Sequence, residues 1–494
     1  MKLKELLRVL PFYETNSATI DTIEFNNIEM DSRKVKQGNV FICISGFTVD
    51  GHDYVTEAEA NGAVAVIAEK SISVKVSIPI IMVTDTNRAL PILAAKYFDY
   101  PTAKLPLIGV TGTNGKTTVT YLLEKIFNLH KKKTGVIGTI QLKIGEDTYP
   151  VANTTPDALM LQRIFDKMRN DNVKQAIMEV SSHALDLGRV YGCEFDIAIF
   201  TNLSQDHLDY HTDLQDYLRA KSLLFSQLGN SYSSESPKFA VINEDDPSSN
   251  LLKHSTAQHV LTYGCKNKAN VMAEDVRLEA TGTSFQLNSP VGKINISSRL
   301  IGMFNVYNML AASAAAIAAR VPLPVIKAAF ENIQGVNGRF EPVAEGQDFA
   351  VIVDYAHTPD SLENVLQTSK EFAKEKVYVV VGCGGDRDRS KRPLMATIAL
   401  KYADHALFTS DNPRTENPKE ILDDMTEGLD ASDGSFEVIE DRQAAIIKAV
   451  KYAKKDDIIL IAGKGHETYQ IIGHTKYDFD DREVARTAIH AKEK

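Results

Sequence analysis

The sequence has few cysteines and none of the patterns that would give them a chemical role. Its four cysteines, Cys43, Cys193, Cys265 and Cys383, are scattered, and no two of them form a C-x-x-C pair. Structural zinc sites and disulfide frameworks both need closely spaced cysteines, so neither is indicated. We interpret all four residues as small, reduced, buried hydrophobic side chains.

Long apolar runs and long basic runs are also missing. The longest nearly uninterrupted apolar run, at 309–319, is too short to cross a bilayer and is typical of a buried helix. The first five residues lack the apolar core of a signal peptide, so we expect a cytoplasmic protein without a membrane span. A net charge of -10 without a basic run argues against a nucleic-acid partner. Local basic residues could still hold an anionic nucleotide.

The length of 494 residues predicts about three domains. We place the boundaries so that residues 1–100, 101–335 and 336–494 each form one domain. Short apolar runs alternate with helical patterns, which is typical of α/β domains with mostly parallel sheets. The last segment predicts a smaller, doubly wound, Rossmann-like domain. The predicted strands lie at 40–44, 63–67, 105–110, 175–180, 195–200, 239–242, 350–353, 377–381, 406–409 and 458–461.

A glycine-rich segment at 109–118 follows a short apolar strand and precedes a helical pattern. Together these elements predict a phosphate-binding loop, because backbone N–H groups and a helix N-terminus would face the phosphates. Lys116 would reach the β- and γ-phosphates of ATP, and Thr117 would bind Mg²⁺. The spacing is a variant, since Val110 stands where the usual motif has glycine. Such a loop predicts that the protein binds ATP. It does not decide the reaction, because a kinase, a ligase, a GTPase switch and a motor could all use such a loop.

Acidic residues and histidines follow the strands of the same segment. Glu179 ends a predicted strand, where a carboxylate would point into the ligand crevice of a parallel sheet. It could bind Mg²⁺ or be a solvated acid. Residues 206–211 bring together two histidines and two aspartates whose spacing fits no usual zinc site. Contact with a second Mg²⁺ or a phosphate is the better hypothesis there. Lys221 by itself is typical of a solvated helical lysine.

Polar clusters follow four predicted strands of the last segment. One such cluster could be turn chemistry alone. Four at equivalent positions predict one rim, where an open α/β sheet binds its ligand. The clusters lie at 354–359, 382–388, 411–414 and 463–467.

These motifs resemble the Mur ligase family of peptidoglycan synthesis, and within it the enzyme that adds the third amino acid. The resemblance covers essentially the whole chain. The family loop T-G-T-N-G-K-T is present at 111–117, which accounts for the variant spacing. The glutamate before V-S-S-H matches Glu179, the histidine of D-H-L-D matches His207, and the lysine of A-K-S-L-L matches Lys221. The resemblance implies that Thr117, Glu179, His207 and Lys221 bind Mg²⁺, with Lys221 carboxylated on its amine.

The resemblance also implies a residue set for each substrate. The catalytic residues would be Lys116, Lys221 and His207. The ATP set is Gly112, Thr113, Asn114, Gly115, Lys116, Thr117, Thr118, Asn305, Asn308, Arg339, Asp354 and His357. The UDP-sugar-dipeptide set is Met30, Ser32, Phe47, Thr48, Val49, Asn153, Thr154, Thr155, Ser181 and Arg189. The set for the incoming amino acid is Arg387, Asp411, Asn412, Pro413, Arg414, Gly463 and Glu467. Leu187 departs from some family members, which have glutamine there.

The implied reaction is ATP-driven amide formation. The γ-carboxylate of D-Glu in UDP-N-acetylmuramoyl-L-Ala-D-Glu would take the γ-phosphoryl group, and an amine would then displace phosphate from the acyl phosphate. The family adds meso-2,6-diaminopimelate or L-lysine. Arg414 and Arg387 offer planar forks for the extra carboxylate, and Glu467 would pair the distal ammonium. We therefore expect diaminopimelate, with L-lysine as the alternative.

Two other interpretations compete with this one. A folylpolyglutamate synthetase shares the ATP-ligase plan, but its folate-binding features would have to replace Ser32 and Thr154, and they do not. A nucleotide switch or structural ATP-binding protein would not couple phosphate release to a second substrate. The expected partners are small molecules only, and we expect a monomer.

Overall fold

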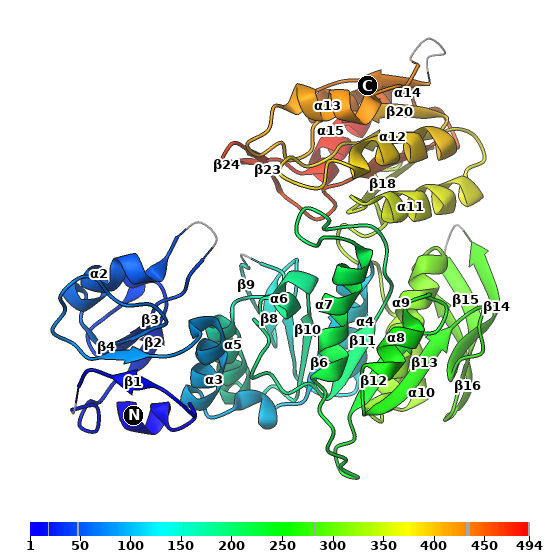
Figure 1. Cartoon of the computed structure of the whole chain (residues 1–494). Coiled ribbons are helices and arrows are strands. Elements are labelled where there is room, and N and C mark those ends of the chain that lie inside the picture. The colour runs from blue at the N-terminus through cyan, green and yellow to red at the C-terminus, as the bar shows by residue number, and fades with distance from the viewer. Residues whose placement is uncertain (18, 47–48, 152, 280–281, 431–434, 493–494) are drawn as a thin grey trace.

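The computed structural model describes residues 1–17, 19–46, 49–151, 153–279, 282–430 and 435–492. Over these residues the strands form three sheets of different sizes and one separate hairpin. Figure 1 shows the N-terminal lobe (sheet β1–β5) at lower left, the central lobe (β6–β16) at lower right and the C-terminal lobe (β17–β22) above them. None of the described helices is both long and apolar enough to cross a membrane.

The N-terminal lobe is built on a small sheet whose neighbouring strands run parallel, except where β1 meets β5. The runs predicted at 40–44 and 63–67 form its buried middle strands. The strand order is β1 (Glu14–Thr15), β5 (Ile80–Met82), β4 (Ala63–Ala68), β3 (Asn39–Ile42) and β2 (Asn27–Glu29). The helices are α1 (Leu3–Leu7), α2 (Val55–Ala60) and α3 (Thr86–Tyr97). Helix α3 packs against α5 (Ala158–Asn170) of the central lobe, and this contact joins the two lobes.

The central lobe contains the longest sheet of the described chain. Its middle strands run parallel, and antiparallel strands extend it at both edges. The strand order is β16 (Gly292–Ser298), β15 (Gly282–Ser289), β14 (Val271–Glu279), β13 (His259–Gly264), β12 (Phe239–Asn243), β11 (Ile197–Phe200), β6 (Leu107–Thr111), β10 (Gln175–Glu179), β7 (Thr134–Ile137), β8 (Leu142–Ile144) and β9 (Asp147–Tyr149).

Helices cover both faces of the middle strands in the central lobe, which is why those strands are apolar throughout. One face packs against α4 (Lys116–Leu129), α9 (Met303–Ala318) and α10 (Leu323–Glu331). The other packs against α5 (Ala158–Asn170), α6 (Ser182–Asp186), α7 (Leu214–Ser226) and α8 (Ser249–His254). The apolar run predicted as a buried helix lies in α9. The cysteines are free thiols; three are buried and Cys265 is half-buried.

The C-terminal lobe is a doubly wound sheet, as predicted. Its strands run parallel except for β17, which lies antiparallel on β18. The order is β17 (Glu341–Pro342), β18 (Ala350–Asp354), β22 (Ile458–Ala462), β19 (Val377–Val381), β20 (His405–Phe408) and β21 (Phe436–Val438). One face carries α11 (Pro359–Phe372), α12 (Lys391–Tyr402) and α13 (Pro418–Thr426); the other carries α14 (Arg442–Tyr452) and α15 (Asp481–Lys492). The separate hairpin is β23 (Tyr469–Ile472) with β24 (Thr475–Asp478).

Candidate active site

The phosphate loop connects β6 to α4 at the middle of the central sheet. Gly112 and Gly115 have φ angles of 144° and 89°, which favour glycine. A Cβ atom on Gly112 would lie 1.9 Å from Oγ1 of Thr201. Gly109 is not part of this loop: it lies inside β6, where a Cβ atom would lie 2.6 Å from the Phe195 ring. The predicted loop at 109–118 was therefore too long, because the first glycine serves packing instead.

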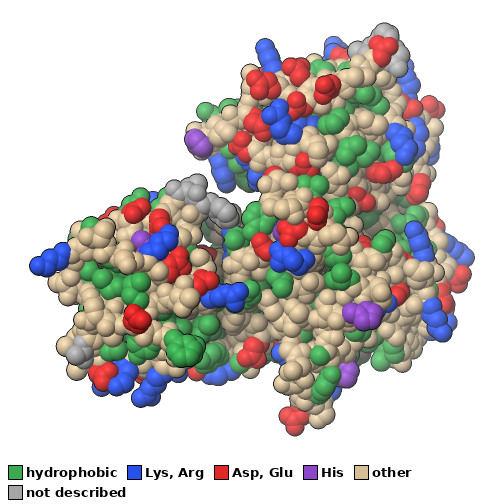
Figure 2. Space-filling model, viewed as in Figure 1, with side chains coloured by type: hydrophobic (Ala, Val, Ile, Leu, Met, Phe, Trp, Pro, Cys, Tyr) green, Lys and Arg blue, Asp and Glu red, His purple; other side chains and the backbone are tan. Residues whose placement is uncertain are grey.

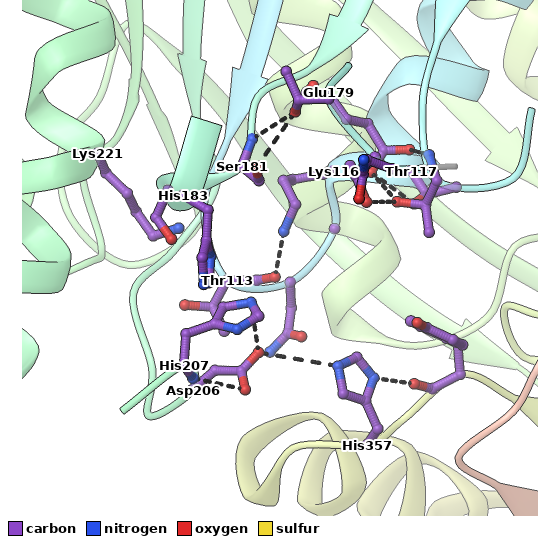
Figure 3. Close-up of a pocket in the computed structure, with 18 of the residues that line it drawn as sticks. Thr113, Lys116, Thr117, Glu179, Ser181, His183, Asp206, His207, Lys221 and His357 are labelled. Atoms are coloured by element: carbon purple, nitrogen blue, oxygen red, sulfur yellow. Dashed lines mark hydrogen bonds and ion pairs between the residues drawn. The ribbon is translucent and has the colours of Figure 1, made fainter. Parts of the chain in front are cut away.

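Two lysines donate hydrogen bonds to the same backbone oxygen of the loop, that of Gly112. Figure 3 shows Lys116 reaching the backbone oxygen of Thr113 beside it. Lys116, the first residue of α4, donates from Nζ to the carbonyl oxygens of Gly112 at 2.9 Å and Thr113 at 2.8 Å. Lys221 of α7 donates to the same Gly112 oxygen at 2.9 Å. Burial lowers the pKa of Lys116, and burial followed by the charge of Lys116 holds the pKa of Lys221 well below its ordinary value. The interpretation of Lys221 as a solvated lysine is wrong.

Glu179 ends β10 and is the hydrogen-bond acceptor beside the loop. Its carboxylate accepts from Oγ1 of Thr117 at 3.1 Å, and from N and Oγ1 of Thr139 at 3.0 and 2.9 Å. Arg339 donates from Nη2 to Oγ1 of Thr117 at 3.0 Å. The side chain is 1% exposed, so Glu179 is not a solvated acid. Carboxylate and hydroxyl oxygens next to a phosphate loop form the hard donor set that Mg²⁺ prefers.

Asp206 lies at the centre of a group of imidazoles and a lysine. Its carboxylate is 3.4 Å from Nε2 of His207, 4.0 Å from Nε2 of His357 and 3.7 Å from Nζ of Lys391. Burial pushes the pKa of Asp206 up, but these neighbours outweigh it and leave the pKa below its ordinary value. Burial lowers the pKa of His207 to about 3 and that of His357 to about 4. Both rings are therefore neutral near pH 7, with a lone pair available.

A cavity of about 330 Å³ brings half of the predicted residues together. From the ATP set it is lined by Thr113, Asn114, Gly115, Lys116, Thr117, Arg339 and His357. From the dipeptide set it is lined by Asn153, Thr154, Thr155, Ser181 and Arg189. Glu179, His207, Lys221 and Arg387 line it as well. The phosphate loop and the polar residues that follow β9 and β10 thus share one space.

Several lining residues were missed from the sequence. Thr139 follows β7, the strand beside β10, so its position at a strand end was the available signal. Tyr217 precedes Lys221 by one helical turn on α7, and the lysine Nζ lies 4.0 Å from its ring centroid. Tyr355 lies within the cluster 354–359 and stacks 4.5 Å below the Arg339 guanidinium.

Other members of the predicted ATP set lie behind the cavity lining. Gly112 belongs to the loop, and Thr118 belongs to α4. Asn308 lies beneath Gly115, where a Cβ atom would come within 2.4 Å of its Oδ1, and donates to Oδ1 of Asn305 at 3.3 Å. Asp354 is buried at the end of β18 and accepts from the backbone N of Phe340 and Ala356 at 2.6 and 2.7 Å. Burial raises the pKa of Asp354 to about 6.

The four polar clusters of the C-terminal lobe form one rim, as predicted. The backbone N of Gly463 donates to Asp354 O at 3.1 Å, and that of Gly385 donates to Asn412 O at 2.9 Å. Gly463 and Asp411 are in contact, since a Cβ atom on the glycine would lie 2.5 Å from Oδ2 of the aspartate. The strands that precede these clusters, β18, β22, β19 and β20, are neighbours in the sheet.

Arg414 lies on this rim next to Pro413 and is half-buried. It has a φ of 51° and donates from Nη1 to Gly385 O at 2.7 Å. Burial, followed by the charge of Arg387, lowers the pKa of Arg414. Two guanidinium groups are thus close enough to repel each other. Glu467 accepts from Nδ2 of Asn412 at 2.8 Å on the same rim.

The predicted uridine-binding residues lie apart from the cavity, in the N-terminal lobe. Ser32 sits in a short 3₁₀ turn (Ser32–Lys34) and donates to Oε2 of Glu57 at 2.7 Å. Met30 follows β2, and Val49 is exposed. Phe47 and Thr48 lie outside the described residues. Figure 2 shows an open notch between the N-terminal and C-terminal lobes on this face.

The C-terminal lobe touches the phosphate loop directly. Asn114 in the loop donates from Nδ2 to Oδ2 of Asp360 on α11 at 2.8 Å, and Ser204 donates to the same oxygen at 3.3 Å. Gln205 donates to Oγ of Ser390 at 3.2 Å. Together with the Arg339–Thr117 bond, these contacts join the C-terminal lobe to the central lobe.

Comparison with known proteins decides the family. Residues 24–98 match the catalytic domain of the Mur ligase family, residues 110–316 the Mur ligase middle domain, and residues 338–465 the glutamate ligase domain of Mur ligases. A UDP-N-acetylmuramoyl-L-alanyl-D-glutamate--2,6-diaminopimelate ligase of Oceanobacillus iheyensis is 69% identical over 492 residues, covering 100% of both chains. The chain belongs to the Mur ligase family. A ligase of the same name from Listeria monocytogenes is 52% identical over 492 residues, covering 100% of this chain and 99% of the relative.

Solved Mur ligase structures share the fold. A structure of a UDP-N-acetylmuramoyl-L-alanyl-D-glutamate--2,6-diaminopimelate ligase matches with a TM-score of 0.69 and 35% identity, covering 99% of each chain. A folylpolyglutamate synthase of Mycobacterium tuberculosis shares the fold at 18% identity, with a TM-score of 0.61 over 75% of this chain and 91% of its own. The fold is therefore common to both ligase types, and the full-length identity places this chain with the Mur ligases.

Proposed function

We propose that this Mur ligase adds meso-2,6-diaminopimelate to the D-Glu γ-carboxylate of UDP-N-acetylmuramoyl-L-Ala-D-Glu, with cleavage of ATP to ADP and phosphate. The observation that carries the proposal is that one cavity is lined by the phosphate loop, by Lys116 and Lys221, and by the predicted dipeptide residues Thr155 and Arg189. A γ-phosphoryl group and a substrate carboxylate can therefore meet in one space. The relatives from Oceanobacillus iheyensis and Listeria monocytogenes described above carry the name of this ligase.

The side chains of the cavity suit transfer of a phosphoryl group to a carboxylate. Lys116 neutralises negative charge on the phosphoryl oxygens, and it need only exchange loop carbonyls for phosphate oxygens to do so. Arg189 donates to Thr155 O at 3.2 Å and offers its remaining N–H groups to an anionic substrate. Holding carboxylate and phosphoryl group together in one site makes the reaction effectively unimolecular.

The residues beside the loop fit Mg²⁺ once phosphate oxygens complete its shell. Within the described part of the chain, no group of three or more His, Cys, Asp or Glu side chains is gathered for a metal. Thr117, Glu179, His207 and a carboxylated Lys221 would hold the ions, which supply further neutralisation of phosphate charge. The buried Glu179–Thr117 pair supports this assignment.

We assign one part of the reaction to each segment. Residues 1–100 would bind the UDP-sugar through Ser32 and its neighbours, residues 101–335 would bind ATP, and residues 336–494 would bind the incoming amino acid. We also propose that the enzyme works as a monomer and that it works in the cytoplasm.

The central test is the substrate dependence of phosphate release. Phosphate is expected to appear stoichiometrically with ligated product only when ATP, the UDP-sugar dipeptide and diaminopimelate are all present. Mass spectrometry of the product would show the added amino acid. Equal phosphate release from ATP alone would contradict the proposal and favour a nucleotide switch.

Carboxylation of Lys221 gives an independent prediction. Burial and the charge of Lys116 lower the pKa of Lys221 and so favour its neutral amine, the form that reacts with CO₂ to give a carbamate and a proton. We expect that removing bicarbonate lowers activity roughly 10-fold or more, since an anionic metal ligand is lost, and that adding it back restores activity. Carbon-13 NMR with labelled bicarbonate should show a carbamate signal that is absent from Lys221→Met. Full activity in Lys221→Met would refute this role.

A further inference from the structure

A buried lysine on the C-terminal rim, Lys464, holds the glutamate that is expected to meet the ammonium of the incoming amino acid. Lys464 follows β22 and its side chain is fully buried. Its Nζ donates to Oε2 of Glu467 at 2.9 Å and to Oδ1 of Asn412 at 3.1 Å. The same Nζ lies 5.6 Å from the ring centroid of Tyr469. A buried charge needs such partners, so the position of Lys464 is tightly determined.

The side-chain amide of Asn412 can face Glu467 in only one orientation. Its Oδ1 accepts from Lys464 and from the backbone N of Ile471 at 2.9 Å, so its amide nitrogen must face the other way. That nitrogen donates to Oε2 of Glu467 at 2.8 Å. Oε2 therefore receives two hydrogen bonds, from Lys464 and from Asn412. Among the described residues no donor reaches Oε1 of Glu467, and this oxygen is not sealed from solvent.

The arrangement also keeps two opposite charges apart. Glu467 is near enough to Arg414 to act on its pKa, yet the two side chains make no ion pair. If Glu467 were released, it could turn toward Arg414, the half-buried rim cation whose pKa it already affects. Such a pair would remove the carboxylate-binding fork and the ammonium-binding oxygen at once. Lys464 and Asn412 oppose such a pair because both donate hydrogen bonds to Oε2 and so hold the carboxylate in place.

We propose that Lys464 is a positioning residue that directs Oε1 of Glu467 to the distal ammonium of diaminopimelate and keeps Glu467 from pairing with Arg414. The inference rests on the proposed function, in which this rim binds the incoming amino acid. Lys464 acts through Glu467 and does not touch the substrate. Its effect is on selection of a substrate that carries both an ammonium and a carboxylate at its distal end.

The test compares diaminopimelate with 2-aminopimelate, which keeps both carboxylates but lacks one ammonium group. For the wild-type enzyme we expect kcat/KM to favour diaminopimelate by ~10- to 100-fold, the range of a charge-assisted hydrogen bond. Lys464→Met is expected to remove most of this preference by raising KM for diaminopimelate. The KM values for ATP and the UDP-sugar dipeptide, and kcat at saturation, should stay within about 3-fold of wild type.

Matched variants separate positioning from a merely structural role. Lys476→Met is the control, because Lys476 is exposed and lies over the same Tyr469 ring at 4.1 Å; it should keep the preference. The losses in Lys464→Met and Glu467→Gln should be non-additive in the double variant. Asn412→Ser, which removes the amide donor, should show the same selective loss even if Lys464→Met does not fold.

The outcomes that overturn the inference are distinct from failure of the proposed function. If wild-type enzyme does not turn over diaminopimelate, the proposed function fails. If wild type prefers diaminopimelate, but Lys464→Met and Asn412→Ser either keep that preference or lose both substrates equally, the positioning role is wrong. Additive effects of Lys464→Met and Glu467→Gln would also overturn it.

Discussion

Replacing Lys116 by methionine is expected to lower kcat roughly 1,000-fold, the scale on which single charge-stabilising groups act in phosphoryl transfer. Lys116 is the first residue of α4, and its Nζ already lies over the loop that faces the phosphates. Methionine keeps most of the length of the unbranched side chain but removes its terminal charge. A coupled assay of ADP formation with all three substrates would measure the loss.

The matched control for this change is Lys125→Met, on the same helix. Lys125 is exposed and lies 5.4 Å from the Tyr121 ring, away from the cavity. We expect its kcat to stay within about 3-fold of wild type, as for most surface substitutions. Similar unfolding temperatures for both variants would show that the fold is intact. A Lys116→Met enzyme with near-normal kcat would rule out its assigned role.

Replacing Arg414 by methionine is expected to lower kcat/KM for diaminopimelate by ~10²- to 10⁴-fold, as for the loss of one partner of a hydrogen-bonded charge pair. Wild-type enzyme should prefer diaminopimelate to L-lysine by ~10³-fold or more, because lysine would leave the guanidinium without a carboxylate. The preference should fall sharply in the variant. Steady-state turnover with each amino acid would measure both effects.

Arg389→Met is the control for Arg414. Arg389 lies near the same rim but is exposed, and it pairs with Asp424 at 2.9 Å. It should keep both activity and amino-acid preference. Wild-type rates with L-lysine equal to or above those with diaminopimelate would contradict the assignment of Arg414 and favour the lysine alternative.

Several of the parallel strands were predictable because helices cover both of their faces and make them apolar throughout, whereas the parallel strands β7 and β13 were not predicted. The runs at 175–180 and 239–242, for example, form β10 and β12. The antiparallel edges were not predictable in the same way. Strand β14 is half-buried or exposed at most of its positions and carries charged residues, so its sequence lacks a continuous apolar run. The meander β14–β16 was therefore missed, although it extends the central sheet.

The candidate site was predicted best where function follows from a position at a strand end. That rule predicted Glu179 and the rim of the C-terminal lobe. In the structure these residues lie at the strand ends, as the rule requires. Side chains that only position another side chain could not be recognised from the sequence. Lys464 lies inside a predicted cluster, but its role depends on a contact with Asn412, more than fifty residues earlier in the chain. Only the folded chain shows that pair.

The hydrogen bond from Asn114 to Asp360 has a thermodynamic consequence. It ties the loop that would hold ATP to the lobe that would hold the amino acid. If nucleotide binding changes the free energy of this contact, it changes the affinity of the lobe for its ligand, and linkage requires an equal effect in return. Each of the two substrates would then change the affinity for the other without direct contact between them. Isothermal titration of each ligand with and without the other would give a single coupling free energy, the same from either direction.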